Sequence, residues 1–308
     1  MKVAATRRVM LGAARMGLHN MWVPCSFQPV RPHTLGIIGL GAIGGSLARQ
    51  AKGAGVARVL GWSPEPSERV AAVKQGALDD APPRAADVAR AADLLFLAAP
   101  PAANLAQLAA LVPALRAETL VSDVGSVKRA VVALAERLGL GVRFAGSHPL
   151  AGTHRRGFDA ARSDLFQGAV VYVTPCAGGD AAAREVAHFW ESVLGAHPVT
   201  LDADQHDTQL AVTSHVPQVV ASLLAQFLAR RSPPGAAPGP GALDTTRLAA
   251  SDPALWTEIL LMNRDEVLPA LRALEEPLGA IERALEAGDG AALAAWLTQG
   301  AEWRRAQP

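Results

Sequence analysis

The chain has 308 residues, of which 50% are hydrophobic and 19% charged, and its formal net charge is +1. This composition is typical of a globular protein and argues against a global field for binding nucleic acid or an anionic membrane. Cys25 and Cys176 lie far apart, which argues against a disulfide framework or a cysteine zinc site. No apolar run approaches the length of a membrane span. We therefore expect a cytoplasmic protein with no metal, no nucleic-acid partner and no membrane contact.

The first 32 residues form an expected flexible extension. Residues 1–32 carry several basic side chains and no acidic one. A targeting peptide has such a composition, but no clear apolar core with a small-residue cleavage site follows. The fold is expected to begin near His33.

From residue 34 short apolar segments alternate with helical ones. The expected strands are residues 35–39, 58–62, 94–98, 119–123, 169–173 and 197–200, with a further short one at 77–78. The expected helices are residues 43–53, 66–76, 127–138 and 180–194. This alternation predicts an α/β domain over residues 33–200, with a mostly parallel sheet covered on both faces.

After about residue 201 the strand signals stop. Helices are expected over residues 204–230, 254–287 and 291–303, and a Pro/Gly/Ala-rich break separates the first two at 232–241. The pattern predicts an all-helical domain over residues 201–308. Because large apolar helix faces are commonly buried against a second subunit, we expect a homodimer.

A glycine motif follows the first predicted strand and opens a helix. It reads Gly39, Leu40, Gly41, Ala42, Ile43 and Gly44. Glycines at this spacing permit a tight turn, close approach of a pyrophosphate and close packing of helix against strand. The alternative is a glycine-rich turn in another kind of α/β protein. The motif makes the first domain a Rossmann-like dinucleotide-binding domain, and Pro100, which closes the strand at 94–98, is assigned to the same site.

The choice between NAD and NADP stays open at this stage. The second strand normally ends in an acid that binds the ribose 2′-hydroxyl of NAD, and here that place is held by Ser63. A serine permits a 2′-phosphate, but Pro64 and Glu65 follow instead of an arginine. Arg69 on the next helix could reach the site, although a solvated side chain is the more frequent outcome.

His148 is the expected general base. It lies within the segment Gly146–Thr153, between a strand end and a proline turn, and an unperturbed histidine titrates near physiological pH. The alternative is a buried histidine that satisfies backbone groups at a turn. Together with the dinucleotide motif, His148 predicts a dehydrogenase.

Several separated motifs, in this order, resemble the prephenate/arogenate dehydrogenase family of tyrosine biosynthesis over residues 34 to about 265. The motifs are Asp123-Val124-Gly125-Ser126-Val127-Lys128, Ser147-His148-Pro149-Leu150-Ala151-Gly152-Thr153, Asp164-Leu165-Phe166, His206-Asp207, Ser214-His215-Val216-Pro217, Asp244-Thr245-Thr246-Arg247-Leu248-Ala249, Ser251-Asp252-Pro253 and Trp256. The resemblance implies an NAD(P)-dependent oxidative decarboxylation in which His148 removes a hydroxyl proton. It also implies that Ser126 bonds the substrate hydroxyl, where the alternative is a helix N-cap.

The substrate-binding residues are expected around the same point. Arg247 is the expected carboxylate anchor, because a guanidinium binds a carboxylate through two hydrogen bonds; the alternative is a structural ion pair with Asp244 or a neighbouring residue. The resemblance implies that Ser214 and His215 face the substrate. It places Thr153 and Trp256 in the same pocket, where Trp256 could instead pack in the core or at a dimer contact. Lys128 is expected to be solvated, and the alternative is that it supports a phosphate or a local charge.

The sequence departs from the family pattern at three places. After Thr153 the family commonly has a gating acid, and here His154, Arg155 and Arg156 follow. A second histidine of the family is replaced by Gln218, and Gly241-Ala242-Leu243 replaces a common Phe-Arg. The basic mouth suits a dianionic substrate.

Prephenate dehydrogenase is therefore the leading hypothesis for the function. Arogenate dehydrogenase, or a dual cyclohexadienyl dehydrogenase, is the nearest alternative, since only the side chain of the substrate differs. A β-hydroxyacid or imine dehydrogenase usually relies on a helical lysine, and no lysine follows Leu201. A non-catalytic NAD(P)-sensing module is the remaining alternative.

Overall fold

The computed structural model describes residues 32–152, 155–233 and 235–307. Nearly all of the expected extension over residues 1–32 lies outside these ranges, and so do Thr153 and His154.

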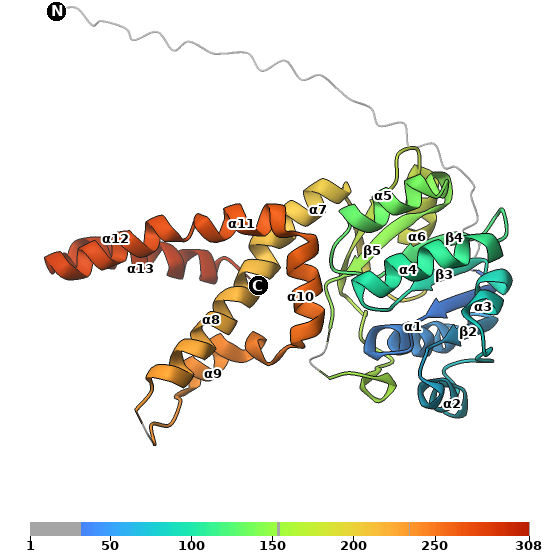
Figure 1. The fold of residues 1–308 in the computed structure, drawn as a ribbon, viewed down its shortest axis with the longest axis horizontal. Coiled ribbons are helices and arrows are strands. Elements are labelled where there is room, and N and C mark those ends of the chain that lie inside the picture. Colours follow the sequence, from blue (N-terminus) through green and yellow to red (C-terminus); the bar gives the residue numbers. More distant parts are fainter. Residues whose placement is uncertain (1–31, 153–154, 234, 308) are drawn as a thin grey trace, which may run out of the picture. The chain divides into compact units, whose positions relative to one another are not determined.

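A mostly parallel sheet organises the α/β region (Figure 1). Four parallel strands have the order β2-β1-β3-β4, and three more have the order β5-β6-β7. The strands are β1 (Thr34–Ile38), β2 (Arg58–Trp62), β3 (Leu94–Leu97), β4 (Leu120–Asp123), β5 (Ala145–Pro149), β6 (Val170–Pro175) and β7 (His197–Thr200). A parallel bridge between Val121 and Phe144 links β4 to the residue before β5. Among the strands that the structure describes, only β5 and β6 pair antiparallel, so the expected mostly parallel sheet is confirmed.

Alternate residues of the strands enter two apolar cores, one on each face of the sheet. In β1, Leu35 and Ile37 pack into one core with α1 and α6, whereas Ile38 packs into the other with α3, α4 and α5. The helices are α1 (Ala42–Gly53), α2 (Pro66–Lys74), α3 (Ala85–Ala91), α4 (Pro101–Leu111), α5 (Arg129–Arg137) and α6 (Asp180–Ser192). Strands that are buried on both faces must be apolar along their whole length, which is why they read as continuous apolar runs.

Two helices and one short segment differ from the sequence expectation. α3 and α4 were not expected, although α4 begins with Pro101 at its first position, where proline is favoured. The expected strand at 77–78 is wrong. Instead the backbone amide of Val59 donates to the Asp79 carboxylate at 2.7 Å, and only an isolated bridge between Leu60 and Asp80 follows.

Every element that the structure describes after Thr200 is a helix. These are α7 (Ala203–Leu210), a π-helical segment (Ala211–His215), α8 (Val216–Arg231), α9 (Pro240–Thr246), a 3-10 turn (Arg247–Ala250), α10 (Pro253–Met262), α11 (Arg264–Arg272), α12 (Glu275–Ala287) and α13 (Gly290–Arg305). A π segment inside a longer helix is frequently found at a functional site. The expected break at 232–241 ends at Gly239, because α9 begins at Pro240.

The single helix expected over residues 254–287 is wrong, because three helices occupy this stretch. Asn263 separates α10 from α11, and its side-chain amide donates to the carbonyl oxygen of Asp207 at 2.7 Å and to Nδ1 of His215 at 3.1 Å. These long-range hydrogen bonds hold Asn263 at φ −113°, ψ 22°, outside the helical region. Tertiary bonding thus overrides the local helical pattern.

One helical stretch is long and apolar enough to cross a membrane by length and composition alone. It is Ala203–Arg231, which contradicts the expectation that no such run exists. Core helices of soluble proteins share this length and composition. Here the stretch carries His206, Asp207 and His215, all buried and hydrogen-bonded to protein groups.

Candidate active site

The glycine turn between β1 and α1 has the geometry that a dinucleotide needs. Gly39 has φ +102°, and a Cβ there would lie 2.6 Å from the carbonyl oxygen of Ala98. A Cβ at Gly44 would lie 1.8 Å from the carbonyl oxygen of Gly39, so the helix can start this close to the strand only with glycine. At Gly41 a Cβ would meet no atom, because the backbone faces open space. The N-terminus of α1 offers its backbone N–H groups to an anion at this point.

Two cavities open on either side of this turn, and both contain Gly41 and Pro100. One cavity, of about 460 Å³, extends from the turn and from Ser126 at the end of β4 toward Trp256 of α10. The other, of about 330 Å³, runs along the end of β2 past Ser63. A pair of cavities joined at a glycine turn fits the two halves of a dinucleotide, with the nicotinamide end on the Ser126 side.

A buried ion pair lies beneath the end of β4. The ammonium of Lys128 contacts both carboxylate oxygens of Asp123 at 2.5 and 2.6 Å and donates to the carbonyl oxygen of Ser147 at 2.8 Å. Lys128 is fully buried, so the expectation of a solvated lysine is wrong. Burial lowers the pKa of Lys128, and Asp123 opposes that effect. The pair fixes the β4 end to β5, directly before His148.

Ser126 lines the larger cavity and does not cap a helix. The N-cap residue of α5 is Lys128, whose own side chain makes no capping hydrogen bond, and Ser126 lies two residues before it. The N-cap alternative for Ser126 is therefore wrong. Its place after the end of β4, in the cavity wall, is where an open α/β sheet positions groups that contact a ligand.

His148 belongs to a chain of three buried side chains. Its Nδ1 lies 2.8 Å from Nε2 of His206, and Nδ1 of His206 lies 2.7 Å from Oδ1 of Asp207. A carboxylate only accepts hydrogen bonds, so His206 carries its proton on Nδ1 and accepts at Nε2. His148 then donates from Nδ1, and its Nε2 is the acceptor nitrogen. This is the tautomer that a general base requires.

Electrostatics keep both histidines of this chain neutral. Burial holds the pKa of His148 well below 6.5, and repulsion from Lys128 and from the protonated forms of His206 and His215 lowers it further. Burial also lowers the pKa of His206, although Asp207 opposes it. For Asp207 burial acts to raise the pKa, but hydrogen bonds from His206 and from the backbone amides of Arg129 and Lys128 outweigh it. The carboxylate thus sits ionised at the N-terminus of α5.

His215 is a second buried histidine, at the end of the π-helical segment. Asn263 donates to its Nδ1, so the ring proton lies on Nε2. Burial lowers the pKa of His215 to about 4, so the ring is neutral. Nε2 is buried and has no hydrogen-bond partner among the described residues. The ring lies edge-on to Trp256 at 6.0 Å, and Trp256 lines the larger cavity.

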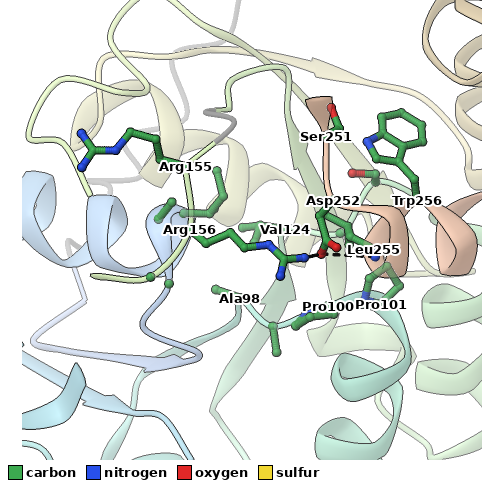
Figure 2. Close-up of a pocket in the computed structure, with 17 residues that line it drawn as sticks. Ala98, Pro100, Pro101, Val124, Arg155, Arg156, Ser251, Asp252, Leu255 and Trp256 are labelled. Atoms are coloured by element: carbon green, nitrogen blue, oxygen red, sulfur yellow. Dashed lines mark hydrogen bonds and ion pairs between the residues drawn. The ribbon is translucent and has the colours of Figure 1, made fainter. Parts of the chain in front are cut away.

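An ion pair spans the larger cavity. Figure 2 shows Arg156 reaching toward Asp252, with which it pairs, while Arg155 points away. Asp252 also caps α10, because its carboxylate accepts from the backbone amides of Ala254 and Leu255. The pair therefore joins Arg156, on the loop after β5, to Asp252, at the N-terminus of α10. The carboxylate of Asp252 balances the positive charge of Arg156 in this structure.

The remaining expected substrate residues are spread more widely. Arg247 is exposed at the start of the 3-10 turn, outside the walls of both cavities, and no ion pair joins it to Asp244 in the described part of the chain. Ser214 is half-buried in the π segment, and Thr153 lies outside the described residues. Gln218, a departure from the family pattern, donates to the carbonyl oxygen of Leu248 at 2.9 Å and so holds the turn that carries Arg247.

Comparison with known proteins identifies the family. The family model "Prephenate dehydrogenase, nucleotide-binding domain" matches residues 47–199, and "Prephenate dehydrogenase, dimerization domain" matches residues 202–299. The chain belongs to the prephenate dehydrogenase family. It is an NAD(P)-dependent oxidoreductase, and the expected Rossmann-like domain followed by a helical region is confirmed.

Three relatives illustrate the range within the family. A cyclohexadienyl dehydrogenase of Zymomonas mobilis is 35% identical over 266 residues, which cover 83% of this chain and 89% of that protein. The structure of prephenate dehydrogenase from Aquifex aeolicus, in complex with hydroxyphenyl propionate and NAD+, has a TM-score of 0.82 at 30% identity and covers 88% of this chain and 97% of that one. The structure of Synechocystis arogenate dehydrogenase has a TM-score of 0.76 at 28% identity. The match covers 88% of this chain and 99% of that one.

Several residues of the site were not assigned a role from the sequence. His206 and Asp207 stood only as a motif, and Asn263 and the pair of Lys128 with Asp123 were not foreseen. The one available signal was the adjacency of a histidine and an aspartate at the start of a predicted helix. Their partner His148 is 58 residues away, so the contact itself could not be read from the sequence.

Proposed function

We propose that this chain oxidises prephenate with NAD(P) and releases CO2, forming 4-hydroxyphenylpyruvate in tyrosine biosynthesis. The observation that carries the proposal is the chain of Asp207, His206 and His148. It leaves a neutral base with its acceptor nitrogen at the end of β5, and Lys128 ties this strand to the end of β4, after which Ser126 enters the larger cavity. Membership of the family supports the same reaction.

The proposed chemistry assigns one step to each group. Nε2 of His148 accepts the proton of the ring hydroxyl, and Ser126 orients that hydroxyl. When bound, the nicotinamide ring would accept the hydride from the ring carbon that carries this hydroxyl group. The bond to the ring carboxylate then breaks, its electron pair enters the ring, and CO2 leaves. The aromatic product takes the proton back from His148, so the histidine is neutral again after each turnover.

Positioning of the substrate falls to the remaining residues. We propose that His215 donates from Nε2 to an oxygen of the substrate side chain, since this buried donor has no hydrogen-bond partner among the described residues. Trp256 walls the pocket beside it, and we also assign Ser214 and Thr153 to substrate binding. Arg247 remains the proposed carboxylate anchor, because its permanent charge and two-pronged geometry suit a dianion.

The domain division and assembly follow the same proposal. Residues 33–200 would bind the cofactor, and residues 201–308 would bind substrate and a second copy of the chain. Large apolar side chains are exposed on α8 and α12, among them Leu223, Phe227, Leu278 and Leu285. The match to a dimerization domain supports a homodimer in which these faces are covered. We place the enzyme in the cytoplasm.

The neutral N–H donor of His215 predicts that the enzyme prefers prephenate to arogenate. A neutral N–H donor fits the keto oxygen of the prephenate side chain, but it cannot accept from the ammonium group that arogenate carries at the same carbon. We expect kcat/KM to be at least about tenfold higher for prephenate, the cost of roughly one unmade buried hydrogen bond. Initial rates with both substrates would measure this ratio. A His215→Phe variant should reduce it toward one, and a wild-type preference for arogenate would contradict the assignment.

A further inference from the structure

The smaller cavity carries an excess of negative charge at the end of β2. Its wall contains Trp62, Ser63, Glu65 and Glu68, together with Gly39 to Gly41 of the turn. No lysine, arginine or histidine occurs among its described lining residues. The backbone amide of Gly39 donates to the carbonyl oxygen of Trp62 at 2.7 Å, so the turn and the strand end are held side by side.

Ser63 is bound to an acid rather than being free for a ligand. Its hydroxyl donates to Oε2 of Glu68 at 2.5 Å and accepts from the backbone amide of Glu65 at 3.2 Å. Ser63 is only 2% exposed, so these bonds engage its hydroxyl. The carboxylate of Glu68, in the first turn of α2, is thereby held against the end of β2.

Arg69, the nearest arginine in sequence, is directed elsewhere. Its Nη1 donates to the carbonyl oxygens of Ser63 at 3.2 Å and Pro83 at 3.5 Å. Arg69 does not line the cavity. The structure therefore lacks, among the described lining residues, the cation that a 2′-phosphate requires.

We infer that Glu68 selects NAD over NADP. The inference rests on the proposed function, because it takes this cavity to hold the adenosine half of the cofactor. In this chain the acid that normally ends the second strand comes instead from the following helix, and Ser63 holds it in place. A carboxylate accepts hydrogen bonds from a free ribose diol, whereas it repels the charge of a 2′-phosphate.

Equilibrium binding of NADH and NADPH to the purified full chain tests this inference without substrate. Titration followed by nucleotide fluorescence gives both Kd values. We expect the wild type to bind NADH at least about tenfold more tightly than NADPH. In Glu68→Gln the amide oxygen can still accept from Ser63, so the geometry is kept and one charge is lost. We expect that variant to narrow the ratio by about tenfold, mainly through tighter binding of NADPH.

Two further variants separate the charge of Glu68 from other effects. Glu118→Gln makes the same change in net charge on an exposed side chain away from the cavity, and it should leave the ratio as in the wild type. Ser63→Ala removes the hydrogen bond that holds Glu68 in place. It should lower the ratio of the Kd for NADPH to the Kd for NADH, but by less than Glu68→Gln does. If wild-type protein bound NADPH as tightly as NADH, or if Glu68→Gln left the ratio unchanged, the inference would be wrong. A chain with the expected binding ratio but no turnover of prephenate would overturn the proposed function alone.

Discussion

Replacing His148 by Asn is expected to lower kcat by roughly 10²-fold to 10⁴-fold, the contribution of a positioned general base. Asparagine can still donate to His206, so the buried hydrogen bond survives, but it has no basic nitrogen for the substrate proton. Binding of NADH should be unchanged, because His148 lies outside the walls of both cavities. Steady-state kinetics and nucleotide titration of the same preparation measure the two effects separately.

The pH profile gives this prediction a second readout. His148 acts in its neutral form, which is populated above its pKa, and burial with the neighbouring charges holds that pKa well below 6.5. Wild-type kcat/KM should therefore stay level as the pH falls from 8 past 6.5 and decline only at lower pH. The residual activity of His148→Asn should lack this decline. His197→Asn, an exposed histidine on β7, is the matched control and should behave like the wild type. Full activity in His148→Asn would remove His148 from the mechanism.

The second large effect is expected from Asp207→Asn. With its nitrogen in the place of Oδ1, the amide loses the hydrogen bond from the backbone amide of Lys128 and donates to Nδ1 of His206. This moves the proton of His206 to Nε2 and makes His206 a donor to His148. His148 would then carry its own proton on Nε2, where it cannot accept another. We expect kcat to fall by about 10²-fold or more, as a reversed tautomer does in other relays of this kind.

Several measurements distinguish this relay from a merely structural role of Asp207. The KM for the nicotinamide cofactor should stay near the wild-type value, and raising the pH should not restore kcat. Asp204→Asn is the matched control, because Asp204 lies on the same helix and its side chain is 83% exposed. That control should lose only its surface ion pair with Arg129. A loss of kcat in Asp207→Asn that recovered fully at high pH would argue against the tautomer explanation.

The α/β region could be predicted from sequence because its signals are local. The glycine motif, the apolar strands and the residues after each strand all depend on neighbours within a few positions. α4 was missed because a Pro-Pro pair was interpreted only as the end of a strand, although proline also favours the first turn of a helix. These elements required no knowledge of distant contacts.

The features that sequence reasoning missed depend on contacts between distant segments. Asn263 ends α10 because it bonds Asp207 and His215, which precede it by 56 and 48 residues. Lys128 is buried because Asp123 and β5 enclose it, and a lysine is rarely found in such a place. Similarly, the sequence indicated no acidic residue at the cofactor site, because Ser63 holds the position at the end of β2. The carboxylate of Glu68 reaches this position from the next helix.

The most direct test of the central claim is the stoichiometry of the reaction on prephenate. Purified full chain would be incubated with prephenate and NAD, and NADH, CO2 and 4-hydroxyphenylpyruvate would be measured together. The account predicts that the three appear in equal amounts, and that His148→Asn forms all three at the same reduced rate. Absence of all three products from wild-type protein that binds NADH would contradict it.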